Sequence, residues 1–173
     1  MFRTIPRYEE ISFGLPYPVM LIDSAEEEID DATGDIIGVS IPDMEKLVAC
    51  LAITRALIPQ RLDGQEVRFM RLALGMTATA FADALQMDKA TFSRWENNKQ
   101  SLGAWADKQV RLFVVLALSQ LASSSKTNPG DLIRLQVIDR QPDQWPHIAL
   151  KRTAGLGNPQ NGPDEWGSMP MAA

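Results

Sequence analysis

The chain has 173 residues, 45% of them hydrophobic, and its net charge at pH 7 is −5. A single cysteine, Cys50, and a single histidine, His147, leave too few groups for a disulfide framework, a His/Cys metal site or a nucleophilic triad. We therefore expect a protein of a reducing compartment that is not an enzyme, has no catalytic residues, and binds no metal and no cofactor.

No secretory signal is apparent, and the longest apolar stretch, residues 112–118, is far shorter than the roughly 20 residues needed to span a bilayer. We expect a cytoplasmic protein that does not contact a membrane. Its charge is divided unevenly, because residues 1–60 have a net charge of −7, residues 61–126 of +3 and residues 127–173 of −1. A basic middle section is typical of a nucleic-acid-binding segment.

The first 60 residues predict a small α+β unit. Residues 19–22 and 36–41 are short β-prone runs. Residues 42–58 have a helical pattern with a proline in the first turn, and the apolar residues of this helix include Leu47, Leu51 and Ile58.

Between the two β-prone runs, seven of the thirteen residues from Asp23 to Asp35 are acidic. We interpret this stretch as the solvated tip of a hairpin. The alternative is a contact with a basic surface on a protein partner.

Residues 61–100 predict three short helices joined by tight turns. Gly75 can end the first helix, because glycine tolerates the left-handed conformation of many helix ends. Thr77 can cap the second helix, whose apolar stripe consists of Ala78, Phe81, Ala82 and Leu85. Only two residues separate this helix from Asp88, a good cap for the third, so the second and third helices are expected to cross steeply.

At about 100° per residue, the third helix turns Phe92 and Trp95 toward the core. Its outward face carries five residues that we predict to contact DNA bases, namely Lys89, Ala90, Ser93, Arg94 and Asn97. A helix of this size fits the major groove, where arginine pairs with guanine and asparagine suits adenine. The alternative is an ordinary solvated helix with the same residue types, but the tight-turn helix pair favours DNA binding.

This part of the chain resembles the helix-turn-helix of XRE/Cro-type repressors over about a third of its length, most specifically in the run Ser93-Arg94-Trp95-Glu96-Asn97. The resemblance implies that Lys89, Ala90 and Arg94 read bases. It also implies that Arg71 on the first helix pairs with Glu96 to hold the recognition helix. The residues predicted to contact phosphates of double-stranded DNA are Thr77, Ala78, Thr91 and Lys99.

The sequence departs from the family pattern at four positions. Gln86 and Met87 stand where the turn usually has glycine and an aliphatic residue, and Asn98 stands where glycine usually follows the helix. Asparagine suits positive φ, so we expect the backbone geometry to be kept. Ala78 replaces a more usual polar residue, which weakens the case for a phosphate contact by that side chain.

Residues 104–121 predict a helix that is apolar on every side between Leu112 and Leu118. Such a helix is normally buried, and the same helix of a second protomer is one cover for it. The predicted dimer interface consists of Val110, Phe113, Val114, Leu116, Ala117 and Leu121. The N-terminal segment is the alternative cover, and the two covers are compatible.

The C-terminal part of the chain has weaker patterns. Residues 131–138 fit both a short helix and a strand. After residue 151, Gly, Pro, Asn and Gln dominate, and such a composition does not favour a core. We expect residues 126–173 to be an extension that is largely flexible after residue 151, with Trp145 and Trp166 as its large anchors.

The order of small β unit, helix and helix-turn-helix is similar to that of MqsA/YgiT-type antitoxin-like regulators, whose N-terminal unit carries a Cys-x-x-Cys-Gly zinc knuckle. Asp30-Asp31-Ala32-Thr33-Gly34 stands where the knuckle would be, so both thiolates are missing and zinc is not predicted. Asp30 and Thr33 would make at best a weak oxygen site for a hard cation.

Together, these patterns predict a mainly α protein: a five-helix XRE-type helix-turn-helix domain at residues 61–125, preceded by a small β-hairpin and helix unit at residues 1–60 and followed by the extension at residues 126–173. The predicted function is a homodimeric DNA-binding repressor, associated with the nucleoid, that reads an inverted repeat with residues 89–97. The alternative is an antitoxin-like or adaptor protein that binds a partner protein through residues 1–60 and autoregulates its operon. The acidic stretch lacks a positioned nucleophile, which argues against an enzyme.

Overall fold

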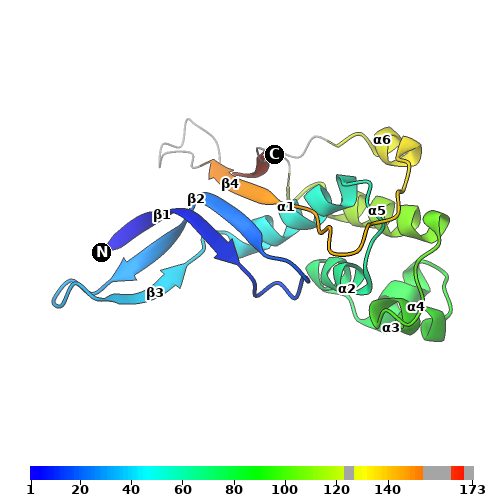
Figure 1. The fold of residues 1–173 in the computed structure, drawn as a ribbon, viewed down its shortest axis with the longest axis horizontal. Helices are drawn as coiled ribbons and strands as arrows, with labels where there is room; N and C mark the ends of the chain where they lie inside the picture. The colour runs from blue at the N-terminus through cyan, green and yellow to red at the C-terminus, as the bar shows by residue number, and fades with distance from the viewer. Residues whose placement is uncertain (123–126, 154–164, 170–173) are drawn as a thin grey trace.

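The computed structural model describes residues 1–122, 127–153 and 165–169, which contain six helices and one five-stranded mixed sheet (Figure 1). Helices take up 39% and strands 24% of the described residues. The prediction of a mainly α protein is therefore wrong. The reason is that strands far apart in the sequence pair with one another, which no local pattern shows. No helix in the described ranges is long and apolar enough to cross a membrane.

The sheet is built around β2 (Val19–Ile29), and β1 (Phe2–Glu10) runs antiparallel along one side of it. Two strands share the other side of β2. The first half of β2 pairs in parallel with β4 (Ala149–Thr153), and the second half pairs antiparallel with β3 (Ile36–Ser40). The sheet ends with β5 (Glu165–Met169), which is antiparallel to β4.

One helix joins the sheet to the rest of the molecule. This helix, α1 (Met44–Leu57), packs against β5 on one side and against α5 (Ala104–Leu118) on the other. Its buried apolar residues lie all around it and are Leu47, Ala49, Cys50, Leu51, Ala52, Ile53 and Ala56. The prediction of a helix over residues 42–58 is confirmed, and the sheet and the helices share one hydrophobic core around it.

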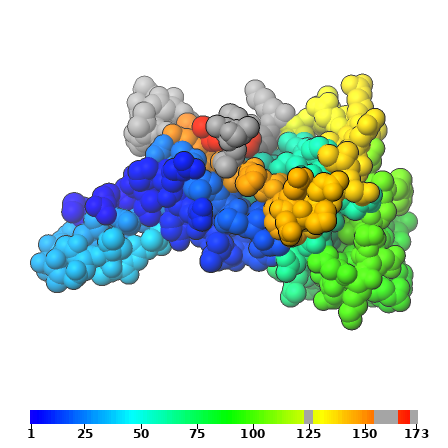
Figure 2. Space-filling view, in the orientation of Figure 1, coloured from blue at the N-terminus to red at the C-terminus, as the bar shows by residue number. Residues whose placement is uncertain are grey.

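The far end of the sheet extends away from the helices as an arm, which consists of residues 1–4 and 26–40 (Figures 1 and 2). The arm contains the start of β1, the end of β2, the turn at residues 30–35, and β3. The acidic stretch therefore forms the expected hairpin tip only at residues 30–35. Its residues Glu26, Glu27 and Glu28, however, belong to β2 and not to the turn.

The three short helices predicted after residue 60 are present as α2 (Gly64–Ala73), α3 (Ala78–Ala84) and α4 (Lys89–Glu96). They gather at the end of the molecule opposite the arm (Figure 1). The fifth helix, α5, follows after a short loop, as expected. This half of the fold therefore has the order of elements that the sequence patterns predict.

The C-terminal part of the chain returns to the sheet. Residues 131–138 combine both expected structures, because α6 (Pro129–Arg134) is a helix and Ile138 then forms an isolated parallel bridge with Gln60. Trp166 in β5 is buried in the core. Residues 165–169 are thus ordered by pairing with β4, although the composition around them did not favour a core. Residues 154–164 lie outside the described residues.

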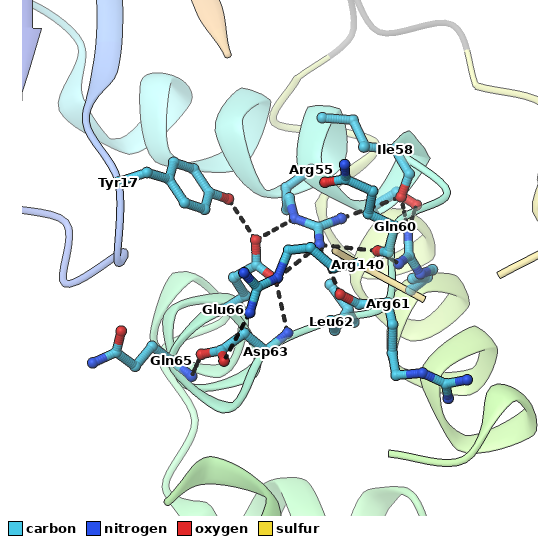
Figure 3. Close-up of polar contacts among 12 residues, drawn as sticks. Tyr17, Arg55, Ile58, Gln60, Arg61, Leu62, Asp63, Gln65, Glu66 and Arg140 are labelled. Atoms are coloured by element: carbon cyan, nitrogen blue, oxygen red, sulfur yellow. Dashed lines mark hydrogen bonds and ion pairs between the residues drawn. The ribbon is translucent and has the colours of Figure 1, made fainter. Parts of the chain in front are cut away.

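Two buried ion pairs hold residues 58–63, the link between α1 and α2. The guanidinium of Arg55 donates to both carboxylate oxygens of Glu66 (Figure 3). The guanidinium of Arg111 donates to one carboxylate oxygen of Asp107. The other oxygen accepts from the backbone N–H of Leu62, in the link, at 2.7 Å. Both guanidinium groups also donate to backbone carbonyls of the link, those of Ile58 and Gln60.

The loop after β1 joins this network through Tyr17, whose hydroxyl donates to Glu66 Oε1 at 2.6 Å. Burial and the negative charge of Glu66 raise the pKa of the Tyr17 phenol well above its usual range, so the hydroxyl remains a donor. Burial opposes the charge on Arg55, but the hydrogen bonds and charge of Glu66 outweigh it and raise the pKa of this guanidinium. The network therefore ties the sheet to the start of α2.

Candidate nucleic-acid interface

The helices α2, α3 and α4 all end in the same way, with one residue in the left-handed region. These residues are Gly75 (φ 65°), Gln86 (φ 52°) and Asn98 (φ 54°). In each case the next backbone N–H bonds back to a carbonyl five residues earlier, as from Met87 to Ala82 at 2.8 Å. These hydrogen bonds satisfy backbone carbonyls that would otherwise have no partner at the end of a helix. The predicted roles of Gly75 and Asn98 are confirmed.

Side-chain caps begin the same three helices. Asp63 and Glu66 form a reciprocal capping box at α2. Thr77 accepts a hydrogen bond from the Ala80 N–H at the start of α3, and Asp88 accepts one from the Thr91 N–H at 2.8 Å at the start of α4. This bond and one from the Thr91 hydroxyl lower the pKa of the Asp88 carboxyl. The caps predicted at Thr77 and Asp88 are confirmed.

The back of α4 is fixed in the core by Phe92 and Trp95, which are both buried as predicted. The Phe92 ring packs on Phe81 of α3, with 5.3 Å between ring centroids, and Phe81 in turn packs edge-on against Phe113 of α5. Because aromatic rings in such contacts have little rotational freedom, α4 is held at a defined rotation about its axis.

Two polar contacts hold the C-terminal end of α4 against α2. Arg71 Nε donates to Glu96 Oε1 at 2.7 Å, which confirms the pair that the family resemblance implied. The side-chain oxygen of Asn98 accepts from the Gly64 N–H at 2.8 Å. A Cβ on Gly64 would lie 2.1 Å from the Trp95 carbonyl oxygen, so only glycine fits there. This role of Gly64 was not predicted from the sequence.

The opposite face of α4 is open to solvent. All five residues predicted to contact bases are exposed, namely Lys89, Ala90, Ser93, Arg94 and Asn97. They are not equally free. Asn97 donates its side-chain amide to the Ser93 carbonyl oxygen at 2.7 Å, and Lys89 lies 3.6 Å from Asp83. Within the part of the chain that the structure describes, the Arg94 side chain forms no hydrogen bond or ion pair, so it is the readiest of these side chains to pair with a base.

The residues predicted to contact phosphates surround α4. Thr77, Ala78 and Lys99 are exposed, whereas Thr91 is half-buried. The Thr91 hydroxyl donates to Asp88 at 3.0 Å, so its proton is already engaged in the helix cap. Ala78, at the first position of α3, can offer only its backbone N–H, as its side chain has no donor. Contacts of these four residues with DNA remain predictions.

The residues predicted to form a dimer interface separate into two groups, all on α5 except Leu121, which follows the end of the helix at Leu118. Val110 and Val114 are buried within the protomer, so they have no surface to offer a second one. Phe113 is half-buried, and Leu116, Ala117 and Leu121 are exposed. Val110 and Val114 are therefore not part of a dimer interface, because α1 covers their side of α5. This helix belongs to the N-terminal unit, which was the alternative cover expected for α5.

A further exposed aromatic residue adjoins this surface. Trp105 is 71% exposed and lines one groove together with Leu112 and Leu116. Trp105 was not predicted to belong to this surface, although its spacing of seven residues from Leu112 places both on one helix face. The exposed apolar face of α5 therefore extends along the whole helix.

No family model matches the chain, and no solved structure matches it. The chain is 27% identical over 124 residues to a protein of Sulfurisphaera tokodaii named "Putative HTH-type transcriptional regulatory protein". The match takes up 69% of this chain but 42% of the relative, so the chain spans less than half of that protein's length. The likeness is thus to a regulator named for the helix-turn-helix, the motif that α3 and α4 form.

Proposed function

We propose that the protein is a sequence-specific regulator of transcription that inserts α4 into the major groove of double-stranded DNA. The observation that supports this best is the contrast between the two sides of α4. Phe92 and Trp95 fix its back, while the five polar or small side chains opposite lie exposed on a helix of major-groove size. The similarity to a protein named as a transcriptional regulator points the same way. The proposal includes no catalytic step.

In this proposal Arg94 and Lys89 read bases, because arginine and lysine pair with guanine acceptors in the major groove. Thr77 and Lys99 contact phosphates on either side. The proposal extends to a homodimer bound to an inverted repeat, with half-sites about one helical turn apart. Such a dimer acts as a repressor at the nucleoid simply by occupying DNA.

The surface that supports the dimer is the exposed side of α5. Leu116 is 54% exposed, and an apolar groove lies on each side of it. One groove is lined by Leu85, Met87 and Trp105, and the other by Leu74, Met76 and Leu121. In a twofold dimer each Leu116 would enter a groove of the other protomer, since a twofold interface uses the same patch on both sides.

Replacement of one arginine tests the DNA interface. Operator duplexes are first selected from random DNA by the wild-type protein. Arg94→Ala should then weaken specific binding by about 1–3 kcal/mol in a gel shift. Arg134→Ala removes the same charge from exposed α6, far from α4 (Figure 1), and should leave specific binding nearly unchanged. Wild-type affinity of Arg94→Ala would contradict the proposed interface.

The dimer is tested separately by Leu116→Glu, which places a charge in the centre of the exposed face of α5. We expect light scattering to show a monomer and DNA affinity to fall steeply, because a dimer doubles the phosphate contacts. Ile133→Glu, at a residue of α6 that is 67% exposed, is the matched control and should remain dimeric. A monomeric wild-type protein would rule out the dimer and leave the α4 interface standing.

A further inference from the structure

The arm has two edge strands, and they differ in how they are protected. The edge strand β1 contains Arg3 within the arm and Pro6 and Arg7 just beyond it. Charged residues and proline are what proteins use to keep edge strands from pairing with other chains. The β3 edge has the sequence Ile36-Ile37-Gly38-Val39-Ser40, with no charge and no proline. Among the residues that the structure describes, β3 pairs with β2 alone, and the register shift between Gly38 and Ile36 is the one irregularity in that pairing, so the other side of β3 is an unpaired edge.

The side chains of β3 are also unusually exposed for apolar residues. Ile36, Ile37 and Val39 are 55%, 61% and 45% exposed, respectively. They lie where the sheet has extended beyond the helices, so no element of the described chain covers them (Figures 1 and 2). A contiguous exposed apolar strip on an edge strand is typical of a place where another strand is added.

The charges around β3 indicate what kind of strand would fit. Asp30 and Asp35 precede its start, and neither is in an ion pair with any residue that the structure describes. Glu28 of β2, opposite Gly38, is likewise in no ion pair within the described ranges. Asp43 and Glu45 follow its end. By contrast, Asp31 and Glu27 are already paired, with the N-terminal ammonium and with Arg3. The apolar centre of the edge is therefore bordered by uncompensated negative charge at both ends.

We propose that β3 is a docking edge for an extended segment of a second, basic protein, which adds a strand to the sheet. The segment has β-branched residues in its centre, against Ile37 and Val39, and lysine or arginine at its ends, against the acidic borders. A second copy of this chain fits poorly, because antiparallel pairing of two β3 strands sets the acidic start of each beside the acidic end of the other. This inference does not depend on the proposed DNA binding.

The test uses the full chain and the acetylated, amidated peptide Lys-Val-Lys-Val-Thr-Val-Lys as the probe. In two-dimensional NMR titrations, we expect the amide signals of residues 36–40 to shift. Binding should weaken as the salt concentration rises from about 50 mM to about 500 mM. The same peptide with glutamate in place of lysine should not bind.

Two matched variants locate the site. Ile37→Lys places a charge on the β3 edge and should weaken peptide binding by roughly ten-fold or more. Ile11→Lys makes the same change at a residue that is 74% exposed outside the arm, and it should bind the peptide as the wild-type protein does. Circular dichroism checks that both variants keep the fold.

Three results would overturn the proposal. The first is a full chain that does not bind the lysine peptide, or whose shifts fall outside the arm. The second is equal peptide binding by the two lysine variants. The third is a self-association of the full chain, seen by light scattering, that Ile37→Lys abolishes, since this would assign the edge to a second copy.

Discussion

The two ends of the molecule are stabilised over very different distances along the chain. In the helix-turn-helix, each helix is capped and terminated by residues within five positions of its ends. In the sheet, Met20 of β2 pairs with Ala149 of β4, and Phe2 of β1 pairs with Glu28 of β2. The surface proposed to bind DNA therefore depends mainly on local structure, whereas the sheet that carries the arm depends on the return of the C-terminal segment.

The junction between the two ends gives the largest expected effect. Glu66→Ala leaves Arg55 buried without its partner and removes the acceptor of the Tyr17 hydroxyl. Loss of one member of a buried ion pair costs about 3–5 kcal/mol, so urea unfolding should shift accordingly. Arg3→Ala, which breaks an exposed pair in the arm, should cost less than about 1 kcal/mol. Equal losses in the two variants would contradict the role given to the junction.

A smaller effect should be confined to the helical end. Gly64→Ala forces a methyl group onto the Trp95 carbonyl and separates α2 from the end of α4. We expect a loss of about 1–3 kcal/mol in the free energy of unfolding. Gly103→Ala has open space around its Cβ and should change stability little. If Gly64→Ala is also neutral, α2 and α4 are less closely packed than described.

The smallest effect should be a gain in stability. Gln86 adopts a left-handed conformation that costs a residue with a Cβ about 1–2 kcal/mol, so Gln86→Gly should stabilise the protein by up to about 1 kcal/mol after the entropy cost of glycine. Thermal unfolding measures this. Asn98→Gly is the informative comparison, because it removes the same strain but also two hydrogen bonds, to Gly64 and Asp63, and should destabilise.

The helix-turn-helix was largely predictable from the sequence for the same reason that it is locally stabilised. Thr77, Asp88 and Gly75 act at helix ends through bonds to near neighbours, so their residue types carry the information. The burial of Phe92 and Trp95 followed from helical spacing alone. The role of Gly64 was not predictable, because it depends on the approach of a helix more than thirty residues away.

The sheet was much less predictable. The pairing of β2 with β4 and the burial of Trp166 depend on contacts across most of the chain. The buried part of α5 was a related case: Val110 and Val114 have the apolar character of an interface, but α1 covers them within the same chain. A residue's apolarity predicts that it is covered and does not identify the element that covers it.

The parallel pairing of β2 with β4 has a consequence during protein synthesis. At about 5–20 residues per second, a ribosome needs on the order of ten seconds to reach Ala149 after it has made Met20. During that interval the nascent chain can complete its three capped helices, while the first half of β2 still lacks one neighbour. The order of translation therefore allows the part proposed to recognise DNA to form before the sheet is closed.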